Sequence, residues 1–207
     1  MLPSYRVYVK NKDTNTYEFG FLGEAQKEDM PPLNANGWTC FWERFWEISD
    51  FEYEAIIKFS YYQQIDGQPK VLGLCRLGIY PFMDQEGIPE VEKKWFLDIT
   101  NLESIQGKGN RPPIIPIGQW LVWYAVDMAF TYCSPDDPNC LVTVDSLEQA
   151  IPYYRSVIGM DGVGYKEGAP GEEIYAFKFT KTQAKQFHDR MGNIYGFPLR
   201  LPPTESE

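Results

Sequence analysis

The sequence predicts an α+β protein in which a mixed, mostly antiparallel central sheet is flanked by helices. Three observations support this prediction. Several segments alternate apolar and polar residues with the period of a β-strand. A long apolar helix follows a Gly/Pro-rich loop at residues 106–116, and a short β-branched segment, residues 141–144, follows that helix. Strand, loop, helix and strand in this order are typical of a sheet with helices packed on its faces.

The composition indicates a folded chain with a substantial core. Of the 207 residues, 43% are hydrophobic and 16% are aromatic, which is enough to pack a core and argues against disorder. No Ser/Gly-rich linker or charge block divides the chain, so we expect a single domain, residues 1–207. Within it, residues 1–50 form a divergent hairpin and aromatic helix, 50–180 the core, and 181–207 a C-terminal helix and tail.

Charge and residue usage narrow the classes of function. The formal net charge of −10 argues against a nucleic-acid partner, because such binding depends on Lys and Arg neutralising phosphates. The N-terminus has no apolar signal region, and no apolar run is long enough to span a bilayer. We therefore expect a cytoplasmic protein without a membrane partner. A single histidine, His188, and four scattered cysteines argue against histidine-dependent catalysis and against a metal site.

The first fifty residues predict a hairpin followed by an aromatic helix. Residues 5–9 and 17–22 read as two strands around a turn at residues 11–15, and residues 24–36 as a loop or short helix. Residues 38–48 place their large apolar side chains at helical spacing. This aromatic face is either part of the core, or the wall of an acceptor pocket or a surface for a protein partner. Its members are Trp38, Phe41, Trp42, Phe45, Trp46 and Ile48.

The next segments predict an antiparallel hairpin and a third strand. Residues 51–61 alternate as a strand, although a helix beginning at Asp50 also fits the spacing. Asp66-Gly67 is a turn signal, and residues 71–80 form the second strand of the hairpin. Residues 81–90 read as a loop, and residues 95–99 as the strand that pairs next.

The second half of the chain begins with the long helix at residues 117–132, which is apolar on nearly all sides and should be buried on more than one side. Residues 134–139 turn the chain into the strand at 141–144. A capping box at Ser146 then predicts a helix with a kink at Pro152 and a C-cap at Gly159. Residues 161–173 read as a loop, 174–179 as a strand and 182–191 as a last helix, with a frayed tail beyond 201.

Three local features together resemble one enzyme family. Asp66-Gly67 before Val71-Leu72-Gly73 is a turn leading into a strand, and Ile117-Gly118-Gln119-Trp120 begins the long helix with a glycine. Ala150 is followed by Tyr154 and then by Ile158-Gly159-Met160. In this order, over residues 50–180, the features resemble the GNAT superfamily of N-acetyltransferases. The resemblance implies an acyl-CoA N-acyltransferase-like fold.

The acyl-CoA-binding loop departs from the family pattern. The family form is Gln/Arg-x-x-Gly-x-Gly/Ala directly before the helix. Here the stretch from Gln106 has Arg111 in place of the last small residue, and a proline-rich insert follows. Pro116 precedes the helix and has no N–H group to offer a phosphate. We therefore describe the acyl-CoA-binding loop as degenerate. The closing helix departs as well, with one extra residue between Tyr154 and Gly159.

The resemblance implies acetyl-CoA, or another acyl-CoA, as the cofactor, and the sparse histidine and cysteine residues lead us to expect no metal. Its pyrophosphate would bind to backbone amides at the N-terminus of the long helix, where the helix dipole favours negative charge. Those amides belong to Ile117, Gly118, Gln119 and Trp120, with Lys108 and Arg111 as auxiliary cations.

The resemblance also implies an acid and a base for acyl transfer. Transfer to an amine needs a base for the ammonium and an acid for the leaving thiolate. Tyr154 matches the family's acid, with Tyr153 as the alternative. The candidates for the base are Asp98, Glu103 and Glu54.

The sequence leaves three functions open. The first is an N-acyltransferase that moves an acetyl or other acyl group to a small-molecule or protein amine, for which the negative charge would suit a cationic acceptor. The second is a catalytically degenerate domain that binds a protein partner through the aromatic helix between Trp38 and Trp46. The third is an unrelated α+β ligand-binding domain.

Overall fold

The computed structural model describes residues 2–62, 69–81, 94–105, 114–133, 140–168 and 173–202. The Asp66-Gly67 turn, most of the 81–90 loop, the loop from Gln106 to Arg111 and the turn at 134–139 lie outside these residues. The contacts group the chain into two compact units. Unit 1 contains Met1–Arg76, Asn101–Val122 and Met191–Glu207; unit 2 contains Leu77–Thr100 and Trp123–Arg190.

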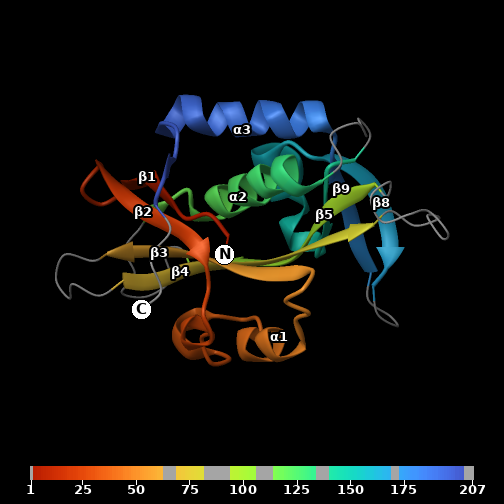
Figure 1. Cartoon of the computed structure of the whole chain (residues 1–207), viewed down its shortest axis with the longest axis horizontal. Coiled ribbons are helices and arrows are strands. Elements are labelled where there is room, and N and C mark those ends of the chain that lie inside the picture. The colour runs from red at the N-terminus through yellow and green to blue at the C-terminus, as the bar shows by residue number, and fades with distance from the viewer. Residues whose placement is uncertain are drawn as a thin grey trace. The chain divides into compact units, whose positions relative to one another are not determined.

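Unit 1 is built on the strands of the N-terminal half. β1 (Tyr5–Asn11) and β2 (Thr16–Glu24) form the predicted hairpin, and β2 pairs antiparallel with β3 (Glu54–Tyr62). The strand order continues from β3 to β4 (Pro69–Pro81). Figure 1 shows these strands side by side, coloured from red to yellow. Two short strands pair with β1: β6 (Ile114–Ile115) and β10 (Leu199–Arg200).

The strands of unit 1 follow their sequence pattern. Val7 and Val9 on β1 are fully buried, whereas Tyr8 between them is exposed, as the alternation of a half-buried strand requires. The alternative of a helix from Asp50 is wrong, because β3 is a strand from Glu54 onwards. Both faces of β3 are covered, since Ile56 and Ile57 point to opposite sides and both are buried.

The strands of unit 2 include a parallel pair as well as antiparallel pairs. β5 (Trp95–Ser104), which continues into unit 1 after Thr100, pairs in parallel with β7 (Val142–Ser146). β7 pairs antiparallel with β9 (Glu173–Phe179), and β9 with β8 (Asp161–Glu167). The mixed, mostly antiparallel sheet with helices confirms the predicted α+β fold class.

Two long helices complete the described chain. α2 (Ile117–Tyr132) begins and ends as predicted, and its side chains are buried on all sides from Trp120 to Val126. α3 (Lys181–Tyr195) is four residues longer than predicted at its C-terminal end. In unit 2, His188 of α3 stacks on Trp123 of α2 at 4.7 Å between ring centroids. Its Nε2 lies 3.5 Å from Asp127, so this histidine packs between helices rather than in solvent.

Gly73 of β4 allows α2 to pack closely in unit 1. A β-carbon at this position would lie 2.6 Å from Ile117 Cγ2 and 2.9 Å from Leu121 Cδ1. We therefore expect Gly73→Ala to lower the free energy of unfolding by about 1–3 kcal/mol, measured by urea denaturation. Ile117→Ala removes the clashing methyl group, so the double variant should lose less than the sum of the two single losses. Strict additivity would contradict this account.

Three local predictions were wrong. The aromatic helix α1 (Trp42–Ile48) begins four residues later than predicted, because residues 39–40 direct their amides to the Glu103 carboxylate instead of into a helix. The capping box at Ser146 does not form: Ser146 ends β7, and its hydroxyl donates to Leu147 O. The Gly-rich stretch after Met160 is strand β8 rather than a loop. Its pairing with β9 continues past the glycines because the register shifts at a bulge between Gly162 and Gly164.

Candidate active site

The parallel pair of unit 2 defines a strand edge of the kind at which ligands bind. Leu97, Asp98 and Ile99 of β5 lie opposite Val142, Thr143 and Val144 of β7, and the pairing ends there. In open α/β sheets, ligands bind at the carboxyl ends of neighbouring parallel strands. The residues around Ile99 and Val144 therefore form the candidate ligand-binding edge of this unit.

Asp98 lies within this parallel pair. Thr143, its neighbour across the strands, donates a hydrogen bond of 2.5 Å from Oγ1 to Asp98 Oδ1. Burial raises the pKa of Asp98, and the nearby Asp145 carboxylate adds to the rise, against the opposing effects of Thr143 and Lys166. Lys166 itself forms a 2.8 Å ion pair with Asp145. A carboxylate with a raised pKa is a better proton acceptor than an ordinary aspartate.

Tyr154 lies one strand away from this edge. Its ring packs on Phe177 of β9 at 5.7 Å between centroids, and Phe177 pairs with Val144 of β7. Tyr153 contacts the Tyr154 ring at 5.3 Å. Tyr154 is only 6% exposed, so the tyrosine belongs to the packed layer over the β7–β9 pair.

The segment that carries Tyr154 is a π-helix, Tyr153–Ile158, preceded by a 3₁₀ turn, Glu148–Ala150, instead of the predicted α-helix. The amides of Gly159 and Met160 both donate to Tyr154 O, at 2.9 and 3.0 Å. Gly159 has φ of 89°, the left-handed conformation expected of a C-cap glycine. Because a π turn holds one residue more than an α turn, it accommodates the extra residue between Tyr154 and Gly159.

Arg190 of α3 holds the end of this π-helix. Its Nη2 donates to Val157 O at 2.8 Å and to Ile158 O at 2.9 Å. We expect Arg190→Ala to lower the free energy of unfolding by about 1 kcal/mol, because both carbonyls lose a charged donor. Lys185→Ala on the same helix removes only an exposed i,i+4 ion pair and should change stability little. Equal effects of the two variants in thermal unfolding would contradict the anchoring role of Arg190.

Glu103 belongs to unit 1, whereas Asp98 and Tyr154 belong to unit 2. Its carboxylate accepts four hydrogen bonds: from Thr39 N and Oγ1 at 2.6 and 2.8 Å, Cys40 N at 3.1 Å and Trp42 Nε1 at 2.9 Å. Burial alone would raise the pKa of Glu103, but these hydrogen bonds outweigh it and lower the pKa. The carboxylate is thus fully occupied in fixing the residues that lead into α1.

The predicted cofactor-binding amides lie at the start of α2 in unit 1. Trp120 N donates to Pro116 O at 3.2 Å as the first bond of the helix, and the Trp120 indole donates to Tyr8 O at 2.8 Å. Only the amides of Ile117, Gly118 and Gln119 precede that first helical bond. Ile117 and Gly118 are buried, and Gln119 is half-buried. Lys108 and Arg111 lie outside the described residues.

The remaining candidates have structural partners. Glu54 forms an ion pair with Arg76 in unit 1, with 2.6 Å between Oε2 and Nη2. Within the described ranges, no three His, Cys, Asp or Glu side chains lie close enough together to hold a metal ion. The described helices include none with the length and apolarity needed to cross a membrane.

Sequence reasoning missed three contributors to the candidate site. Thr143 was within reach of the sequence, since the alternation of the two strands pairs it with Asp98 once a parallel register is assumed. Phe177 and Arg190 gave no such signal, because contacts between a strand or helix and a distant π-helix depend on tertiary packing.

Comparison with known proteins places the fold. No family model matches the chain, and no curated protein matches it. A structure described as a bacterial toxin matches 81% of this chain and 93% of its own at 14% identity, with a TM-score of 0.53. An uncharacterized protein from Bacillus halodurans matches 90% and 95% at 9% identity, also with a TM-score of 0.53. The AtaTR complex with AcCoA matches 81% and 96% at 13% identity, with a TM-score of 0.49.

These comparisons and the strand topology define the class of fold. The chain has a GNAT-like, acyl-CoA N-acyltransferase-like fold, as the sequence resemblance implied. At 14% and 9% identity, the two matches with TM-scores above 0.5 establish the fold alone.

Proposed function

We propose that this protein is an acyl-CoA-dependent N-acyltransferase that moves an acetyl or other acyl group to an amine. The observation that carries the proposal is the parallel β5–β7 pair of unit 2, which ends at Ile99 and Val144 with Tyr154 packed one strand away. Such an edge is where ligands bind in sheets of this kind. Asp98 shares one face of the sheet with Thr143, whereas Tyr154 packs on Phe177 on the face of Ile99 and Val144, so the two groups flank the edge from opposite faces.

The proposed reaction assigns one proton transfer to each residue. Asp98 accepts a proton from the acceptor ammonium, and the free amine nitrogen then attacks the thioester carbonyl carbon. The carbon–sulfur bond breaks as the new carbon–nitrogen bond forms, and the leaving thiolate takes a proton from the Tyr154 hydroxyl. The nitrogen loses its second proton to solvent as the amide forms, and solvent returns a proton to the tyrosinate. The raised pKa of Asp98 suits a proton acceptor. The net charge of −10 favours a cationic acceptor, either a small amine or a protein lysine.

The pyrophosphate of acyl-CoA would bind at the first turn of α2. The proposed donors are the backbone amides of Ile117, Gly118 and Gln119, with Lys108 and Arg111 as cations from the preceding loop. Trp120 contributes through packing, because its amide and its indole already donate to Pro116 O and Tyr8 O.

The structure also gives a reason to retain the second candidate, a GNAT-like domain that binds a protein partner without catalysing transfer. Pro116 has no N–H group, the Trp120 amide is engaged, and the side chains of Ile117 and Trp120 are packed in the core of unit 1. These features reduce the number of amides that remain for a phosphate.

Calorimetry with acetyl-CoA separates the two candidates. The transferase is expected to bind acetyl-CoA with a dissociation constant in the micromolar range, and Gly118→Glu should abolish the heat by placing a negative charge beside the pyrophosphate. Thr131→Glu is the matched control, since it adds the same charge at an exposed position at the other end of α2. Because Gly118 is buried, the unfolding temperature of each variant is measured in parallel.

Two outcomes would refute the transferase. One is the absence of both heat and a thermal shift at millimolar acetyl-CoA. The other is undiminished binding by a folded Gly118→Glu variant. Either result would favour the binding domain. If the wild type binds acetyl-CoA and Gly118→Glu does not, the acceptor class can be identified next. A screen of polyamines and lysine peptides with a thiol-release assay serves this purpose.

A further inference from the structure

Large apolar side chains gather at the surface of α1 and the turn that follows it in unit 1. Phe41 is 55% exposed, Ile48 48%, Phe51 47% and Tyr53 44%. We call these four residues the α1 patch. Clustered exposed apolar side chains of this kind are typical of interaction surfaces, and aromatic side chains are enriched there.

The spacing of α1 makes the patch continuous. Phe41, Phe45 and Ile48 lie at positions i, i+4 and i+7 and therefore share one side of the helix. Phe45 joins this stripe to the core, because its half-buried ring packs edge-on against the fully buried Trp42 at 5.6 Å between centroids, whereas Phe41 and Ile48 are exposed. Trp46 contacts Phe51 at 4.7 Å between ring centroids and joins the helix to the turn. The sequence could not divide this face into a core part and a surface part.

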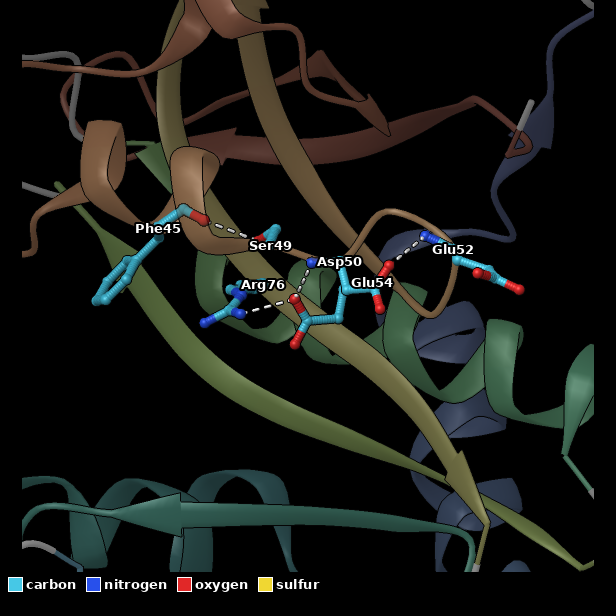
Figure 2. Close-up of polar contacts among 6 residues, drawn as sticks. All are labelled: Phe45, Ser49, Asp50, Glu52, Glu54 and Arg76. Carbon is cyan, nitrogen blue, oxygen red and sulfur yellow. Dashed lines mark hydrogen bonds and ion pairs between the residues drawn. The ribbon is translucent and has the colours of Figure 1, made fainter.

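A network of polar contacts holds the patch in shape, as Figure 2 shows. Ser49 Oγ donates to Phe45 O at 2.8 Å and closes the end of α1. Asp50 N donates to Glu54 Oε2 at 2.9 Å, and Glu52 N donates to Asp50 Oδ1 at 3.1 Å. The turn is therefore fixed before anything binds, which lowers the entropic cost of binding.

The centre of this network is the ion pair between Glu54 and Arg76. Glu54 Oε2 lies 2.6 Å from Arg76 Nη2, and their side chains are only 9% and 12% exposed. The guanidinium carbon also lies 5.9 Å from the centre of the Phe45 ring. The pair links the turn to β4 (Figure 2) and neutralises Glu54, so this carboxylate adds nothing to the charge of the surface.

The rim of the patch is acidic. Between Phe41 and Tyr53, the exposed charged side chains are four carboxylates and one cation, Arg44, which pairs with Glu47 at 3.4 Å. A second copy of this chain would bring carboxylates against carboxylates, and an anionic membrane or a nucleic acid would be repelled. The carboxylates are Glu43, Glu47, Asp50 and Glu52.

We propose that the α1 patch docks a basic amphipathic segment of a partner protein. Apolar side chains of that segment would cover Phe41, Ile48 and Phe51, and its Lys or Arg side chains would pair with the acidic rim. Apolar contact at the centre with charge complementarity at the edge is the usual anatomy of such an interface. This surface is independent of the proposed acyl transfer.

The test uses a synthetic helical peptide of leucine and lysine, roughly 14 residues or four turns long, with its leucines on one face. Fluorescence anisotropy should show saturable binding to the full chain that weakens with added salt. The double variant Ile48→Ser/Phe51→Ser should weaken binding at least about tenfold. Glu47→Lys/Glu52→Lys should weaken it and reduce its salt dependence. Thermal unfolding confirms that each variant is folded.

The controls decide between this surface and general attraction to an acidic protein. Tyr17→Ser and Phe197→Ser remove side chains that are 61% and 63% exposed elsewhere on unit 1, and they should leave the affinity unchanged. A peptide with glutamates in place of its lysines should not bind. The proposal is overturned if the leucine–lysine peptide does not bind, or if it binds the patch variants as tightly as the wild type. It is also overturned if sedimentation shows that the patch mediates self-association.

Discussion

Tyr154→Phe is expected to lower the rate of acyl transfer by about 10²–10⁴-fold while leaving the affinity for acetyl-CoA unchanged. The variant loses only the hydroxyl group, which is the proposed proton donor to the leaving thiolate. The ring stays, so its packing on Phe177 at 5.7 Å should be preserved. Single-turnover transfer and calorimetry, run on the same preparation, measure the two quantities separately.

Tyr153→Phe is the matched control for this experiment. Tyr153 is its neighbour on the π-helix and contacts the Tyr154 ring at 5.3 Å. If the two variants lose the same activity, the hydroxyl of Tyr154 has no special part in proton transfer. If only Tyr153→Phe loses activity, the acid is the neighbouring tyrosine.

Glu103→Gln is expected to lower the free energy of unfolding by roughly 2–4 kcal/mol. The carboxylate accepts two hydrogen bonds on each oxygen, from Thr39 on Oε1 and from Cys40 and Trp42 on Oε2. An amide in its place must turn its NH₂ group towards one of these donor pairs, so two donors lose their acceptor. Urea denaturation at neutral pH measures the loss, and Glu43→Gln, on the exposed side of α1, should change stability little.

The contribution of the Glu103 carboxylate to the free energy of unfolding should decrease at low pH. Its hydrogen bonds lower the pKa of the folded carboxyl group below its ordinary value of 4.5. The stabilisation is therefore fully present above pH 4.5 and is lost as the pH falls through the folded pKa. The stability difference between wild type and Glu103→Gln should stay constant from pH 8 to about 5 and narrow at lower pH. A difference that grows on acidification would contradict this assignment.

Much of the fold was accessible from the sequence because the signals were local. The alternation in β1, β3 and β9 and the apolar α2 each follow from residues within one element. The errors occurred where a distant group changed the local preference. Residues 39–40 are kept out of the helix by Glu103, which is more than sixty residues away. The π-helix at Tyr153 ends in carbonyls bound by Arg190.

The candidate site was harder to predict from the sequence for the same reason. Tyr154 and Asp98 were found through resemblance and strand position, and their catalytic roles remain predictions. Folding brings four hydrogen-bond donors to the Glu103 carboxylate and brings Arg76 to Glu54. Neither set of partners can be inferred from the neighbouring residues in the sequence. Periodicity shows which face of a segment is apolar, but it does not show which partner reaches a given carboxylate.

The outer edge of β1 has a consequence for association between molecules. Leu199–Arg200 of β10 pair with Tyr5 and Arg6, and Ile114–Ile115 of β6 pair with Lys10 and Asn11. Between them, the Trp120 indole donates to the carbonyl of Tyr8. An open edge strand is a template for strand exchange and amyloid-like growth. Here two short strands and one indole occupy that template, so intermolecular strand pairing at β1 requires all three to detach. Strand β6 and the indole come from one segment, residues 114–120, and β10 from the C-terminal part of the chain.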